Sequence, residues 1–223
     1  CKLLNKLDHI VAVSQYTANQ MRVVGVTVPI SVIPNSVDCA LFYPATHRED
    51  IRRDEILICG RISVVRGSEV QYKGHDVLFA ALPLAERQLG RKLRIRVVGA
   101  GDDAERLREV TRNLQIQDRV CFAGKVSVGE LRENYQRCGV FCMPSRVNQN
   151  PTGYWTGEGF GIVYIEAAAC ARPVIASCEG GARETIVPDI TGKLVDPRSA
   201  ESVAKAIAEI LDNPVLADEM GRV

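Results

Sequence analysis

The chain has 223 residues, of which 46% are hydrophobic and 25% are charged. This balance excludes a disordered chain and a miniprotein without a core. It has 28 Lys and Arg residues and 27 Asp and Glu residues, so the net charge is +1. There is no basic excess to indicate a nucleic-acid partner.

The eight cysteines and three histidines follow no metal-ligand or disulfide pattern. No CxxC pair occurs, and His9, His47 and His75 share no ligand spacing, so the sequence predicts no metal site. Most cysteines lie in apolar runs such as ILICG and VCFAG. We therefore expect buried free thiols in a reducing, cytoplasmic compartment.

The first 43 residues predict a short separate unit. HIVAV at 9–13 is typical of a buried strand, Ser14 of the cap of a helix that runs to about Val24, and ISVI at 30–33 of a second strand. PNSVDCALFYP at 34–44 has two prolines and no helical period, which indicates a connector. The sequence thus divides into residues 1–43, a tail and linker, and a domain at 44–223.

That domain alternates apolar strands with amphipathic helices. The predicted strands are 56–59, 93–98, 120–123, 140–143, 173–176 and 193–195, and the predicted helices are 75–89, 104–114, 127–137, 162–171 and 199–211. A capping box of Ser127 and Glu130 begins the third helix, and residues 144–157 are predicted to be irregular. The alternation predicts an α/β, Rossmann-like parallel sheet with helices on both faces. Such sheets bind ligands at the carboxyl ends of their strands.

Two loops at that edge carry anion-binding chemistry. Gly60 and Arg61 follow the first strand, and Lys73 comes twelve residues after Arg61, so two cations can face one anion. EGFGIVYIE at 158–166 places glycines where a helix begins, and a helix start offers free amides and a partial positive charge. Glu166 lies in an otherwise apolar stretch and needs a polar partner or a ligand.

The EGFGIVYIEAAACARPVIAS segment, with its Glu-x7-Glu spacing, resembles the signature of the retaining glycosyltransferase group 1 family. VIPNSVDCALFYP, ILICGRI, YKGHDVLFAAL, IRVVGAGDDAERL, DRVCFAGKVSVGEL and GGARETI agree with it in order, so the resemblance covers residues 10–212. It implies the carboxy-terminal, donor-binding half of a GT-B fold, preceded by a tail of the amino-terminal acceptor domain.

The resemblance implies a role for each matching residue. The catalytic residues would be Arg61 and Lys73, which neutralise the leaving diphosphate, and Glu158, which contacts the donor sugar. Glu166 would bind the ribose hydroxyls, Lys125 and Val126 would lie against the base, and Arg146 would border the sugar. The other implied donor-binding positions are Gly60, Gly99, Gly159, Phe160, Gly161 and Ile162.

The implied reaction moves a sugar from GDP-mannose or a UDP-sugar to a glycan or lipid-linked acceptor, with retained anomeric configuration and no metal or other cofactor. The acceptor would bind through the amino-terminal domain, so this fragment alone would be nearly inactive. The partners expected are the nucleotide sugar and the acceptor, with no nucleic acid. The expected location is the cytoplasm, including the inner face of the membrane. A nucleotide-sugar 2-epimerase of the same fold and a non-catalytic nucleotide-sugar-binding module are the alternatives.

Three further features of the sequence are weaker signals. GAGDDA at 99–104 is similar to a dinucleotide fingerprint, but we expect a tight strand-to-helix turn there. Tyr154 and Trp155 are suited either to stacking on a sugar or to holding their loop against the body of the domain. Glu184 in GGARETI is suited either to approaching the donor site or to capping a helix start, and we expect the cap.

Overall fold

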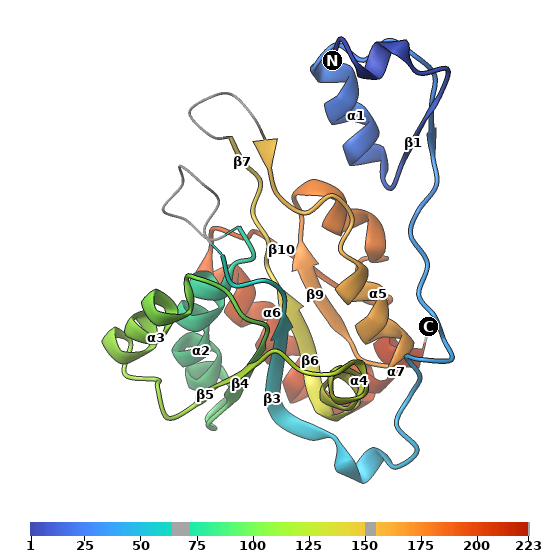
Figure 1. Cartoon of the computed structure of the whole chain (residues 1–223). Helices are drawn as coiled ribbons and strands as arrows, with labels where there is room; N and C mark the ends of the chain where they lie inside the picture. Colours follow the sequence, from blue (N-terminus) through green and yellow to red (C-terminus); the bar gives the residue numbers. More distant parts are fainter. Residues whose placement is uncertain (64–71, 150–154, 223) are drawn as a thin grey trace.

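The computed structural model describes residues 1–63, 72–149 and 155–222 (Figure 1). A six-stranded parallel sheet has the strand order β10-β9-β6-β3-β4-β5. Its strands are β3 (Arg52–Cys59), β4 (Arg94–Val98), β5 (Val120–Gly124), β6 (Cys138–Met143), β9 (Val174–Ser177) and β10 (Gly192–Val195). The α/β, Rossmann-like class predicted from the sequence is confirmed.

Helices cover both faces of this sheet. One face carries α2 (His75–Leu89), which packs against α3 (Ala104–Asn113) and α6 (Ala200–Asp212). The other carries α4 (Val128–Arg137), α5 (Ile162–Ala169) and α7 (Pro214–Arg222). Because both faces are covered, Ile56, Leu57 and Ile58 of the central strand β3 are all fully buried, which explains its continuous apolar run.

The amino-terminal unit forms a separate two-stranded sheet. β1 (Ile10–Ala12) and β2 (Ile30–Val32) pair in parallel, and α1 (Gln15–Val23) connects them. Ser14 caps α1 by accepting from the amide of Thr17, as the sequence predicts. An extended connector then descends beside the six-stranded sheet before β3 begins (Figure 1).

Several element boundaries differ from the sequence prediction. β3 begins at Arg52, before the predicted strand, because Arg53 and Glu55 are paired with charged groups rather than left in water. The segment predicted to be irregular contains a short antiparallel pair, β7 (Asn148–Gln149) and β8 (Trp155–Thr156). α7 was not predicted, and it packs through Ala217 and Met220.

The cysteine prediction is half right. All eight thiols are free. Cys59, Cys138, Cys142 and Cys170 are buried, whereas Cys1, Cys39, Cys121 and Cys178 are exposed. Cys121 is exposed although its run is apolar, because it lies on β5, an edge strand of the sheet.

Candidate functional site

The carboxyl ends of β3 and β4 approach each other closely. The amide of Gly60 donates to the carbonyl of Val98 at 3.0 Å. A Cβ on Gly99, whose φ is +132°, would lie 2.0 Å from the carbonyl oxygen of Gly60, so no side chain fits there. A Cβ on Gly60 would lie 3.4 Å from the stem of Lys73. Gly60, Gly99 and Lys73 therefore form one wall at this edge of the sheet.

Lys73 and Glu158 form an ion pair across this wall. The ammonium of Lys73 donates to a carboxylate oxygen of Glu158, and their side chains are only 11% and 15% exposed. The Lys73 nitrogen also lies 5.0 Å from the centre of the Tyr72 ring. The pair joins the loop before α2 to the loop before α5, so the two segments singled out in the sequence meet.

The start of α5 lies beside the same glutamate. Gly161 has a φ of +91°, and a Cβ there would lie 2.3 Å from the ring of Tyr164 and 3.1 Å from Cγ of Glu158. No side chain caps the helix at Gly161. The amides of its first turn therefore remain available to an anion, as a helix start provides. Of the flanking residues, Phe160 is buried and Ile162 is exposed.

Glu166 projects from the second turn of α5 and has the polar partner that the sequence requires. The Tyr135 hydroxyl donates to its carboxylate at 2.9 Å. Burial raises the pKa of Glu166, and the hydrogen bond from Tyr135 opposes this. Cys59, at the end of β3, lies close enough for the Glu166 charge to add to the burial that raises the pKa of its thiol to about 11. Glu166 thus lies at the carboxyl edge of the central strand.

The remaining predicted site residues are less closely joined. Arg61 is exposed on the loop after β3, and no contact among the described residues links it to Lys73 or Glu158. Lys125 is exposed and Val126 half-buried, both directly after β5. Arg146 pairs with Asp76 of α2, so its guanidinium is already engaged by a carboxylate.

The amino-terminal unit docks onto the signature loop, a contact that no local pattern in the sequence indicates. The Ser14 hydroxyl donates to the carbonyl of Gly159 at 2.5 Å, and the Thr17 hydroxyl donates to the same oxygen at 3.2 Å. Glu184 accepts from the amides of Gln15 and Tyr16 at 2.8 and 2.7 Å. Glu184 thus lies at a helix start, but that helix is α1, far away in the chain, whereas its own segment forms the 3-10 helix Gly180–Thr185.

The weaker signals also have structural counterparts. Residues 99–103 form the predicted turn between β4 and α3, where buried Asp103 pairs with Arg106 at 2.6 Å. Trp155 is 47% exposed. Tyr154, its partner in the sequence prediction, lies outside the described residues.

Within residues 1–63, 72–149 and 155–222, no helix is both long enough and apolar enough to cross a lipid bilayer. The same ranges contain no group of three or more His, Cys, Asp or Glu side chains arranged to hold a metal ion.

Comparison with known proteins matches most of this chain to one family. Residues 53–222 match the model of the family described as "Glycosyl transferases group 1". A GDP-mannose-dependent alpha-(1-6)-phosphatidylinositol monomannoside mannosyltransferase of Mycobacterium tuberculosis is 35% identical over 216 residues, which are 96% of this chain and 55% of that protein. A D-inositol 3-phosphate glycosyltransferase of Kineococcus radiotolerans is 30% identical, over 86% of this chain and 46% of that protein.

The structural comparison agrees. The sucrose-phosphate synthase of Thermosynechococcus elongatus superposes with a TM-score of 0.80 at 31% identity, over 99% of this chain and 53% of that one. The chain spans about half the length of the curated relatives it matches. The match includes β1, α1 and β2 as well as the six-stranded sheet.

Proposed function

Because this chain belongs to the glycosyl transferases group 1 family, we propose that it is the donor-binding half of an enzyme that transfers a sugar from a nucleoside diphosphate sugar to an acceptor. The observation that carries the proposal is the Lys73–Glu158 ion pair beside the uncapped start of α5. A cation, free amides and a carboxylate meet there, and these groups suit a diphosphate joined to a sugar.

In this proposal each group has a separate task. Lys73 and the exposed Arg61 neutralise the diphosphate as the bond to the sugar breaks, which is electrostatic stabilisation of developing charge. Glu158 accepts hydrogen bonds from sugar hydroxyls and, through its contact with Lys73, orients the ammonium. Glu166 accepts from the ribose hydroxyls while Tyr135 fixes its carboxylate. Lys125 and Val126 lie against the base, and Arg146 borders the sugar.

We propose GDP-mannose as the donor and a lipid-linked or free glycan as the acceptor. The name of the mannosyltransferase that is 35% identical to this chain supports this choice. UDP-sugars are the alternative donor class, and we propose that the transfer retains the anomeric configuration. Retention is tested by NMR of the product's anomeric proton, once this half is joined to an acceptor half.

Calorimetry of the chain with GDP, GDP-mannose, UDP, UDP-glucose and ADP tests the donor proposal. We expect GDP and GDP-mannose to bind most tightly, with the same affinity in excess EDTA. Arg61→Ala should weaken binding of the diphosphates, whereas Lys205→Ala, an exposed lysine on α6, is the matched control that should not. If none of the nucleotides binds, the proposed function is wrong.

A further inference from the structure

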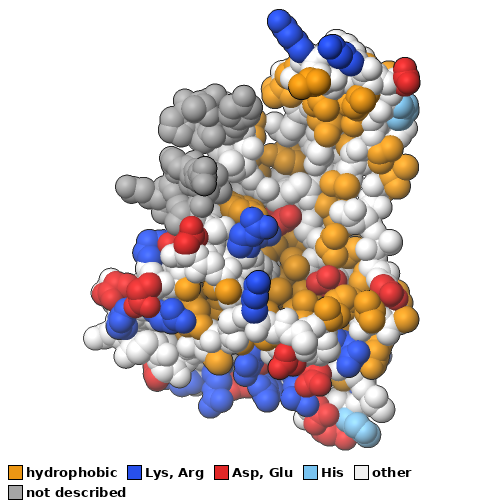
Figure 2. Space-filling view, in the orientation of Figure 1, with side chains coloured by type: hydrophobic (Ala, Val, Ile, Leu, Met, Phe, Trp, Pro, Cys, Tyr) orange, Lys and Arg blue, Asp and Glu red, His pale blue; other side chains and the backbone are white. Residues whose placement is uncertain are grey.

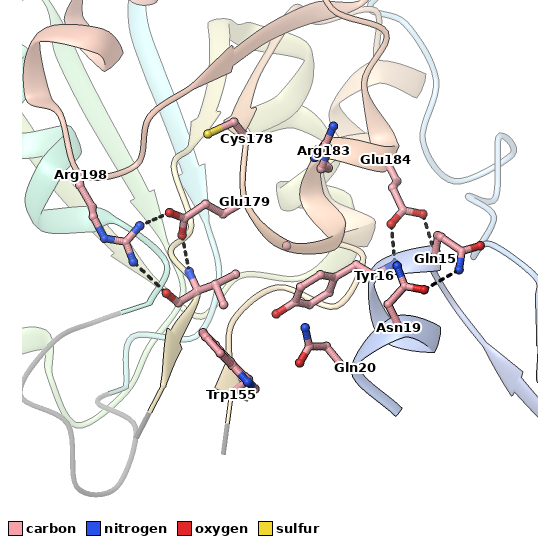
Figure 3. A pocket seen from close by; sticks show the side chains of 12 residues that line it. Gln15, Tyr16, Asn19, Gln20, Trp155, Cys178, Glu179, Arg183, Glu184 and Arg198 are labelled. Atoms are coloured by element: carbon pink, nitrogen blue, oxygen red, sulfur yellow. Dashed lines mark hydrogen bonds and ion pairs between the residues drawn. The ribbon is translucent and has the colours of Figure 1, made fainter. Parts of the chain in front are cut away.

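A second pocket lies between the amino-terminal unit and the domain, on the other side of the loop that carries Glu158. It has a volume of about 750 Å³. Its walls come from α1, from the segments around Val147 and Trp155, and from the loops after β9 and β10 (Figure 3). None of the residues assigned above to the donor lines it.

Two aromatic side chains face this space. Trp155 is 47% exposed at the start of β8, although so large an apolar surface is usually covered. Tyr16 extends from α1 toward the same space (Figure 3). Burial, and then the nearby charge of Glu179, raise the pKa of Tyr16, so its phenol stays protonated at neutral pH and can both donate and accept a hydrogen bond.

Planar polar groups complete the lining. The side-chain oxygen of Gln20 is buried and has no hydrogen-bond partner among the described residues. A buried acceptor without a partner costs free energy unless a ligand or water satisfies it. The Gln20 side chain lies beside Tyr16 and opposite Trp155 (Figure 3). The pocket thus presents an unsatisfied acceptor next to exposed aromatic surface.

The charged residues of the lining are largely neutralised by one another. Arg198 pairs with Glu179 and also donates to the carbonyl of Val147 at 2.8 Å, while Glu179 accepts from the Val147 amide at 2.8 Å. The carboxylate of Glu184 is occupied by the amides of α1. Arg183 is exposed, and among the described residues its guanidinium forms no ion pair. This balance does not favour a phosphate, which would require several free cations.

We propose that this pocket binds a neutral carbohydrate and holds sugar units of a glycan acceptor. The C–H face of a pyranose ring stacks on aromatic surfaces such as Trp155 and Tyr16, and its hydroxyls donate to and accept from planar side chains such as Gln20. That the pocket binds a carbohydrate is inferred from its lining residues alone. That this carbohydrate is the acceptor rests on the proposed function.

The pocket lies next to the sugar end of the proposed donor site. A Cβ on Gly180, which lines the pocket, would lie 2.8 Å from the carbonyl oxygen of Glu158 and 3.2 Å from Val147. One segment of backbone therefore has the Lys73–Glu158 pair on one side and this pocket on the other. A glycan held here would lie close to the donor sugar.

The single tryptophan of the chain makes the test specific, because Trp155 is its only source of indole fluorescence. We would titrate the chain with α-1,6-mannobiose and with maltose, and separately with GDP. We expect a saturable change in Trp155 emission with mannobiose. Gln20→Leu should weaken mannobiose binding about tenfold, the effect of one lost hydrogen bond, without lowering the Tm.

Trp155→Ala removes the reporter, so its binding is followed by saturation-transfer NMR of the sugar, where the signal should disappear. Lys73→Met is the matched control, since it should weaken GDP binding and leave sugar binding unchanged. The proposal is overturned if neither disaccharide binds. It is also overturned if Gln20→Leu and Trp155→Ala both bind mannobiose as the unaltered chain does. GDP binding without sugar binding would overturn this inference alone. Sugar binding without nucleotide binding would overturn the proposed function and the acceptor role, and would leave a carbohydrate site.

Discussion

The Lys73–Glu158 ion pair has both a structural and a proposed functional role, and substitution can separate them. Lys73→Met keeps the length of the side chain but leaves the carboxylate without its cation, so we expect the free energy of unfolding to fall by about 1.5–3 kcal/mol. GDP binding should weaken about 100-fold, as loss of a charge-assisted phosphate contact would produce. Denaturant unfolding and calorimetry measure the two effects.

The double variant Lys73→Met with Glu158→Gln is the control for this pair. Removing both charges avoids an unpaired carboxylate, so much of the stability should return. The loss of GDP binding should remain. If stability and affinity recover together, Lys73 supports the fold and does not bind the diphosphate.

We predict that the charge of Glu166 lowers the stability of the folded chain and that its carboxylate is needed for ligand binding. Burial raises its pKa, which means that the ionised carboxylate is less stable in the folded chain than in the unfolded chain. Glu166→Gln removes this charge and keeps an acceptor for Tyr135, so the Tm at pH 7 should rise. Binding of GDP should weaken, and binding of inorganic diphosphate, which has no ribose, should not. A lower Tm, or equal losses for both ligands, would contradict the assignment.

His75 should make the chain sensitive to acid. It is fully buried at the start of α2, and burial, followed by the charge of Lys73, lowers its pKa to about 3. The unfolded chain binds this proton below a pH of about 6.5, whereas the folded chain does not until pH approaches 3. Stability is therefore retained above pH 6.5 and falls below it, by up to about 1.4 kcal/mol per pH unit from this group.

Unfolding curves for His75→Gln between pH 4 and 7 test this directly. The difference in the free energy of unfolding between the two chains should change steadily with pH in that range. His47→Gln, the same substitution at an exposed histidine, is the matched control. Parallel curves for both variants would show that His75 titrates alike in the folded and unfolded chains.

At the scale of elements, α1 is held by a partner 168 residues away along the chain. The Glu184 carboxylate accepts from the amides of Gln15 and Tyr16, which a helix start leaves without intrahelical acceptors. Glu184→Ala should cost about 0.5–2 kcal/mol, confined to the amino-terminal unit. Hydrogen exchange should accelerate in α1 and remain unchanged in β3. Glu184→Gln keeps an acceptor and should have a smaller effect; equal exchange in all three chains would contradict the capping role.

Elements with strong local signals were predictable from the sequence. The bounds of α2 agree with those predicted, because its apolar spacing and Gly90 define them locally. The Ser127–Glu130 capping box forms as predicted. The early start of β3 and the existence of α7 were missed, since Asp218 of α7 pairs with Arg53 of β3 and no local pattern reveals that contact. A contact such as this one, between elements far apart in the chain, leaves no pattern within either element.

The same limit applies to the candidate site. The EGFG segment and the cations near Gly60 were recognisable because glycines and charges interrupt apolar runs. No local pattern predicts that Ser14 and Thr17 donate to the Gly159 carbonyl, that Asp76 pairs with Arg146, or that Tyr135 donates to Glu166. Each of these contacts joins segments at least 31 residues apart, and only the folded chain brings them together.

At the scale of the whole molecule, exposed apolar side chains gather on the amino-terminal unit. Leu3, Val11, Val23 and Ile33 are 80%, 56%, 72% and 58% exposed. Figure 2 shows apolar side chains across this end of the molecule, whereas charged side chains crowd the opposite end. A two-stranded sheet also leaves its backbone edges open. An apolar surface of this kind favours association with another protein surface.

We therefore expect the chain to self-associate through this unit as its concentration rises. Val11→Lys places a charge on an exposed position of β1 and should shift sedimentation velocity profiles toward the monomer. Val215→Lys, at a residue of α7 that is 66% exposed, is the matched control and should leave the association unchanged. Equal effects of both substitutions would mean that added charge alone suppresses association. A monomer at every concentration would mean that the apolar side chains of this unit do not bind one another in water.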